Sequence, residues 1–169
     1  MPPFVFFLIQ LSIIAYALVA GVFLAFSDFI MRSLATTSNQ GGVEAMQVIN
    51  REVFRWVFMT LFIGMAPMSL IIGGYAWTNL SGPPALLIIA AAAVYLVGCF
   101  GVTVAFNVPM NEALARMELS SDATRAYWLQ TYVPRWTFWN TVRTVASTTS
   151  AALLLFGLLW LTQSQAQQV

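Results

Sequence analysis

The sequence predicts an all-α fold, a four-transmembrane-helix antiparallel bundle with short interfacial helices in its two long loops. Hydrophobic residues make up 60% of the chain and charged residues only 8%, and the mean hydropathy is +0.80. Soluble domains are typically about 25% charged. Charge-free stretches of membrane-crossing length, about 20 residues or more, are separated by polar, turn-rich segments. We therefore expect a single membrane domain over residues 1–169.

The first helix is expected over residues 4–33. Residues 1–27 carry no charged side chain, and this run is long enough to cross a bilayer. The start of the chain lacks the positively charged region of a secretory signal peptide, so we keep the segment as a helix. Asp28 and Arg32 lie one helical turn apart and can pair, which extends the helix beyond the apolar run.

Two further helices are expected in the centre of the chain, over residues 56–77 and 84–108. An amphipathic segment over residues 43–55 leads into them. Residues 56–111 carry no charge, which is too long for one span and about right for two. The divider is the turn signal at residues 79–84, Asn-Leu-Ser-Gly-Pro-Pro. Helix three is expected to end near Val108, because Pro109 would free a backbone carbonyl if the helix continued.

The second long loop is expected over residues 112–133, and the last helix over residues 135–161. This loop is amphipathic and is predicted to be helical around residues 121–130, with Ser120 or Ser121 as the N-cap. Six of the seven arginines lie in or beside the two long loops. The positive-inside rule then places both loops in the cytoplasm and both termini outside, in an integral membrane protein of a bacterial inner membrane.

Composition also excludes several kinds of site. The net charge of +1 gives no electrostatic reason to expect nucleic-acid binding. The chain has no histidine and a single cysteine, Cys99, so the common zinc, copper, iron–sulfur and haem sites lack their ligands. We therefore predict no metal and no organic cofactor.

The strongest functional signal is the segment Trp136-Thr-Phe-Trp-Asn-Thr-Val-Arg143. Helical spacing puts Trp136, Asn140 and Arg143 on one face. A cation inside a hydrophobic helix is a functional-site hypothesis by default. The antiparallel arrangement should bring polar and aromatic residues from the other helix ends to the same place. The expected pocket residues are Asp28, Asn50, Phe54, Asn107, Asn111, Trp136, Trp139, Asn140 and Arg143.

Such a pocket would combine an anion-binding arginine, amides that donate and accept hydrogen bonds, and aromatic walls. It suits a flat, oxygen-bearing aromatic or quinone-like molecule. The same residues have a structural interpretation, since amides and arginines between membrane helices form hydrogen bonds worth about 0.6–2 kcal/mol each. The tryptophans can equally form an interfacial belt.

Four motifs resemble one known family. In order they are Ser27-Asp-Phe-Ile-Met-Arg32, Met46-Gln-Val-Ile-Asn50, Phe106-Asn-Val-Pro-Met-Asn111 and Trp136-x-x-Trp-Asn-x-x-Arg143. Together they resemble the anthrone-oxygenase-like family of small four-helix membrane proteins. The resemblance implies oxidation of anthrones to anthraquinones without a metal or flavin, with O₂ as co-substrate. It implies catalytic roles for Asn107, Asn140 and Arg143, and substrate contacts for Asn50, Asn111 and Trp136.

One position departs from the family pattern. Thr141 follows the Trp-Asn pair where many relatives have histidine, so the natural general base near neutral pH is missing. Two functions are therefore left open. The first is a monooxygenase acting on an anthrone-, phenol- or quinol-like aromatic. The second is a non-catalytic membrane subunit, or a binder of a small molecule, lipid or quinone, whose polar cluster fixes helix packing.

A transporter is a third and weaker interpretation, because four spans lack the repeated halves of many carriers. The expected partners are the lipid bilayer and a hydrophobic aromatic small molecule. The sequence also leaves open a homo-oligomer or a larger membrane complex.

Overall fold

The computed structural model describes residues 1–37, 40–55 and 57–166, and this part of the chain is helical with short connections. Residue 56, the expected start of the second helix, lies outside the described residues. Four helices are long and apolar enough to cross a membrane: Pro3–Ala35, Val57–Asn79, Gly82–Ala115 and Asp122–Ser164. The prediction of an all-α fold with four spans is confirmed, and the chain is an integral membrane protein.

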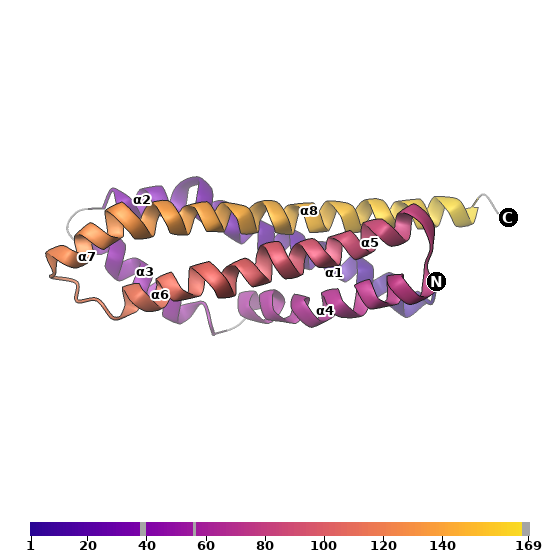
Figure 1. The fold of residues 1–169 in the computed structure, drawn as a ribbon, viewed down its shortest axis with the longest axis horizontal. Helices are drawn as coiled ribbons and strands as arrows, with labels where there is room; N and C mark the ends of the chain where they lie inside the picture. The colour runs from indigo at the N-terminus through magenta and orange to yellow at the C-terminus, as the bar shows by residue number, and fades with distance from the viewer. Residues whose placement is uncertain (38–39, 56, 167–169) are drawn as a thin grey trace.

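The four long helices pack side by side in a closed ring. Helix α1 (Pro3–Ala25) contacts α4 (Val57–Asn79) and α8 (Val133–Ala166), and α5 (Gly82–Val94) contacts the same two helices. Figure 1 shows the N-terminus, the last described turns of α8 and the α4–α5 turn at one end of the molecule. The opposite end, called the loop end below, holds α2 (Met31–Ala35), α3 (Gly41–Glu52), α6 (Val108–Ala115) and α7 (Asp122–Tyr127).

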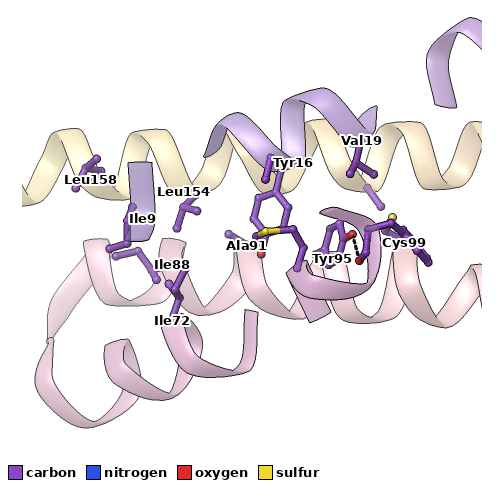
Figure 2. Close-up of a cluster of buried hydrophobic side chains, with 14 of the residues drawn as sticks. Ile9, Tyr16, Val19, Ile72, Ile88, Ala91, Tyr95, Cys99, Leu154 and Leu158 are labelled. Carbon is purple, nitrogen blue, oxygen red and sulfur yellow. Dashed lines mark hydrogen bonds between the residues drawn. The ribbon is translucent and has the colours of Figure 1, made fainter. Parts of the chain in front are cut away.

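The core between the helices is filled by side chains from all four of them. Figure 2 shows Tyr16 of α1, Ile72 of α4, Ile88 of α5 and Leu154 of α8 in this cluster, and each is at most 2% exposed. In a bilayer such packing is held by van der Waals contact, which small residues improve. At Gly98 an added Cβ would lie 2.7 Å from a side-chain carbon of α8, so only glycine permits this approach.

A second buried cluster closes the loop end. It joins residues of both predicted loops, and its members are Met31, Val43, Met46, Leu114, Trp128, Tyr132 and Trp136. Gln47 of α3 donates from Nε2 to the carbonyls of Leu114 (2.8 Å) and Met117 (3.2 Å) at the end of α6. Carbonyls near a helix end have acceptor capacity that the helix itself does not use up. The two long loops are therefore packed against each other.

Helix three was expected to end near Val108. In the structure it continues to Ala115. Pro109 lies in the first turn of α6, directly after the π-helical segment Thr103–Asn107. Pro109 cannot donate the backbone bond of an ordinary helical residue, and the π-helical turn before it lets the helix continue past that missing bond. The predicted end was wrong because the wide π turn starts a new helical register at this point.

The second predicted loop is also largely helical. The cap expected at Ser120 or Ser121 is at Ser121, whose Oγ accepts a hydrogen bond from the N–H of Ala123 at 3.2 Å. Helix α7 then continues through the π-helical segment Trp128–Tyr132 into α8. The last helix thus begins well before residue 135. Tyr132 therefore lies on a helix, one turn before Trp136. Further π-helical segments are Phe26–Ile30 and Tyr95–Gly101.

Candidate functional site

Arg143 lies about three turns into α8 and is only 4% exposed. Its Nη2 donates to Asn140 Oδ1 at 2.6 Å, and its Nη1 donates to Thr103 Oγ1 at 3.3 Å. Its Nε is buried without a hydrogen-bond partner. The guanidinium carbon lies 4.1 Å from the ring centre of Phe23 and 5.2 Å from that of Trp136. Two aromatic faces thus provide cation–π stabilisation.

Among the residues that the structure describes, no carboxylate pairs with Arg143. The three ion pairs within the described part of the chain join residues of the loop end, and none includes Arg143. All six acidic residues of the chain have exposed side chains. Buried charges in proteins are normally paired. An arginine stabilised only by dipoles and aromatic faces keeps much of its attraction for an incoming anion.

Asn140 and Asn107 tie the helices together around Arg143. Asn140 donates from Nδ2 to the carbonyl of Phe23 and to Ser27 Oγ, both at 2.6 Å, which joins α8 to α1. Asn107 donates from Nδ2 to the carbonyl of Trp136 at 3.3 Å. Both asparagine side chains are fully buried. Their bonds fix the position of the arginine and of the indole beside it.

A second hydrogen-bonded chain runs along the loop side of the arginine. Trp136 donates from Nε1 to Asn111 Oδ1 at 2.8 Å, and Tyr132 donates from its hydroxyl to the same oxygen at 2.8 Å. The Tyr132 hydroxyl in turn accepts a bond from Asn50 Nδ2 at 3.3 Å. This chain connects α3, α6 and the start of α8.

A cavity of about 100 Å³ lies against these residues, between α1, α3, α4 and α8. Its polar lining consists of Asn50, Thr103, Asn111 and Arg143, and its aromatic walls are Phe23, Phe26, Phe54, Phe58, Phe62 and Trp136. Two lining residues are exposed, Val22 of α1 (39%) and Phe54 (65%). Both are apolar, so the cavity reaches the outer surface of the molecule beside apolar side chains.

The structure brings most of the predicted site residues together. Of these, Asn50, Phe54, Asn111, Trp136 and Arg143 line the cavity. Asn107 and Asn140 do not line it, but they hydrogen-bond to Trp136 and Arg143 as described above.

Two predicted residues lie elsewhere. Trp139 stacks on Phe106 with ring centres 3.7 Å apart and is not among the residues that line the cavity. Asp28 is exposed, and its Oδ1 lies 3.9 Å from Nη2 of Arg32. Neither residue is in a position to contact a ligand in the cavity.

Several residues at the site were not among those that the sequence predicted, and Phe23, Thr103 and Tyr132 are the ones that contact its polar groups. Tyr132 had a visible signal, because it lies one helical turn before Trp136 and continues the face of Asn140. Thr103 resembled an ordinary packing residue of a membrane helix. Phe23 contributes a ring face and a backbone carbonyl, and neither is visible as polarity in a sequence.

A family model described as anthrone oxygenase matches residues 51–153, a range that includes Thr103, Asn111 and the whole segment from Tyr132 to Arg143. Neither the comparison with curated proteins nor that with solved structures gave a match.

Proposed function

We propose that this chain, which belongs to the anthrone oxygenase family, oxidises an anthrone-like, phenolic or quinol-like aromatic with O₂. The reaction would use neither a metal nor a flavin. The ligand would enter the cavity from the bilayer, and its ionised oxygen would be bound by Arg143.

The observation that carries this proposal is the buried arginine without a carboxylate partner, set in the wall of an aromatic cavity. Deprotonation of an anthrone gives an enolate whose negative charge lies largely on oxygen. A guanidinium fixed in a dry, low-dielectric site stabilises that charge far more than water would. The rings of Phe23 and Trp136 hold the guanidinium, and the neighbouring rings offer faces on which a flat ligand can stack.

The oxidation balances with one molecule of O₂. The electron-rich ring carbon of the enolate donates electrons to O₂, a carbon–oxygen bond forms, and a proton completes the hydroperoxide. Loss of water breaks the O–O bond and the remaining C–H bond, and leaves a carbonyl. One anthrone and one O₂ therefore give one anthraquinone and one water, and Arg143 is unchanged at the end.

The first proton has no strong base to receive it among the described side chains that line the cavity. The chain contains no histidine. Thr141 bonds to Ser27 Oγ at 3.0 Å and does not line the cavity. We therefore assign deprotonation to water or hydroxide, with Arg143 lowering the pKa of the ligand by stabilising its anion.

Size limits how a ligand can enter. An engineered cavity of about 150 Å³ holds one benzene ring, and this one is about 100 Å³. A fused three-ring molecule would insert only its oxygen-bearing edge next to Arg143. The rest of its ring system would extend past Val22 and Phe54 into the lipid. With the loop end on the cytoplasmic side, as arginine placement favours, the cavity would open to the inner leaflet of a bacterial inner membrane.

Oxygen uptake by the purified protein with anthrone tests the proposal. Arg143→Ala should lower the rate by about 10²–10³-fold, the usual effect of removing one oxyanion donor. Arg135→Ala is the matched control, since it removes an exposed arginine from the same helix. Equal rates for wild type and Arg143→Ala would remove Arg143 from the reaction and refute the proposal.

The bonds that Asn140 makes to Phe23 and Ser27 support a second function, in which the polar cluster fixes helix packing. In this case the protein would hold an aromatic ligand without oxidising it. Ligand binding that is lost in Arg143→Ala, together with anthrone oxidation no faster than in buffer, would favour this binder over the enzyme.

A further inference from the structure

The chemistry of Trp136 fixes the orientation of the Asn111 side chain. An indole N–H can only donate a hydrogen bond. The Asn111 atom 2.8 Å from Trp136 Nε1 must therefore be the amide oxygen, not the nitrogen. This assignment rests on donor chemistry and so avoids the usual ambiguity between amide oxygen and nitrogen.

The orientation of Asn111 then determines the direction of the neighbouring bonds. The Tyr132 hydroxyl lies 2.8 Å from the same oxygen and must donate to it. Because that hydroxyl proton is used, the Tyr132 oxygen is left to accept the bond from Asn50 Nδ2. Turning the Asn111 amide over would place its N–H group against the indole N–H and lose that bond. The Tyr132 hydroxyl would then have to accept from Asn111 instead of donating to it. Tyr132 is fully buried and Trp136 nearly so, so water cannot readily replace those bonds.

These bonds use the side-chain oxygen of Asn111 and leave its amide nitrogen, Nδ2. Its oxygen is occupied twice, and the Nδ2 group is the part of this side chain still able to bond to a ligand. Asn111 lines the cavity together with Arg143, whose Nε has no partner. Building on the proposed function, we propose that Asn111 Nδ2 is a second donor to the bound oxyanion, and that Tyr132 is a positioning residue that keeps this N–H₂ group turned toward the cavity.

The test uses an anionic dye in place of the substrate. The phenolate of 2-hydroxyanthraquinone absorbs at a longer wavelength than the neutral phenol, so absorbance reports the ionisation of the bound dye. Donors to its oxygen lower the pH at which the bound dye ionises. This measurement needs neither O₂ nor turnover, so it separates the oxyanion site from the oxygenase reaction.

Two variants act on the second donor in different ways. Tyr132→Phe keeps the ring and removes one of the two donors that hold the Asn111 oxygen, the other being Trp136. It should weaken dye-anion binding about tenfold and raise the ionisation pH of the bound dye accordingly. Asn111→Asp preserves the shape and still accepts from Trp136, but it replaces the donor with a negative oxygen. It should weaken anion binding by roughly a hundredfold or more.

Two controls separate positioning from folding. Tyr16→Phe removes the hydroxyl of an equally buried tyrosine that bonds Ser69 in the core, away from the cavity, and it should leave the dye titration unchanged. The neutral ether 2-methoxyanthraquinone should bind to wild type and Tyr132→Phe alike, because it carries no charge on its oxygen. If Asn111→Asp fails to fold, Tyr132→Phe and the ether decide the question.

The outcomes are distinct. A wild-type shift in dye ionisation that Tyr132→Phe diminishes and Tyr16→Phe retains would support the inference. A shift that is lost in Arg143→Ala but intact in Tyr132→Phe and Asn111→Asp would overturn it and leave the role of Arg143 standing. Equal losses for the dye anion and the ether would also overturn it. A wild-type protein that does not shift the dye would overturn both proposals.

Discussion

Thr103 offers a sharp test of whether an unbalanced charge binds the ligand. Its Oγ1 accepts a bond from Arg143 Nη1 at 3.3 Å, and the residue lines the cavity. Thr103→Asp would place a carboxylate next to the guanidinium. Two unit charges about 4 Å apart attract by about 4 kcal/mol at an effective dielectric constant of about 20. An internal counter-ion should therefore weaken binding of an aromatic anion by up to about 10³-fold.

Thr103→Val is the matched control at the same position. It nearly preserves the shape of the side chain and removes the hydroxyl, but it leaves Arg143 without a carboxylate. The loss is one interhelical hydrogen bond, worth about 0.6–2 kcal/mol in a membrane protein, and the bond that Thr103 Oγ1 donates to the carbonyl of Cys99 within its own helix. We expect the valine variant to bind the anion within about tenfold of wild type, whereas the aspartate variant does not.

Binding is measured by absorbance titration of the 2-hydroxyanthraquinone phenolate into detergent-solubilised protein, with the neutral methyl ether alongside. Oxygen uptake with anthrone provides a second measurement on the same preparations. An aspartate variant that binds the anion as tightly as wild type would refute the reasoning, because neutralising Arg143 would then have no effect on anion binding. So would a valine variant that loses as much as the aspartate variant.

Other predictions concern stability and the limits of the site. Gly98→Ala should destabilise the protein by about 1–3 kcal/mol, because its Cβ would lie 2.7 Å from a side chain of α8; Gly21→Ala, with nothing within 4 Å, should not lower the melting temperature in detergent. Asn140→Ala removes three bonds and should lower that temperature more than Gly98→Ala does. Trp139→Phe should leave anthrone oxidation near the wild-type rate and Trp136→Phe should reduce it, and equal rates for the two variants would contradict the cavity described above.

The four spans were predictable because bilayer thickness sets a length that apolar runs must match. The helix ends were less predictable, since they depend on tertiary contacts. Pro109 is an example: a proline after an apolar run indicates a helix end, yet the preceding π turn lets helical structure continue. No pattern in the sequence distinguishes that turn from an ordinary helical one.

The site was predictable where charge or amides stood out against an apolar background. Arg143 and Asn140 are conspicuous for that reason, and so is Asn111. Trp139 was predicted as an aromatic wall of the pocket, next to Asn140 in the sequence. Helical geometry turns it to a different face, where it stacks on Phe106. Tyr132 was missed because the segment before residue 135 was interpreted as a loop, which removed it from the face that it shares with Trp136.

The apolar mouth beside Val22 and Phe54 changes what concentration means for this protein. A ligand that partitions into hydrocarbon reaches such an opening by diffusion in two dimensions. Its occupancy of the cavity then follows its mole fraction among the lipids and not its molarity in the buffer. Doubling the detergent or lipid at constant ligand should halve the apparent saturation at low occupancy, so titrations are comparable only at a fixed ratio of amphiphile to protein.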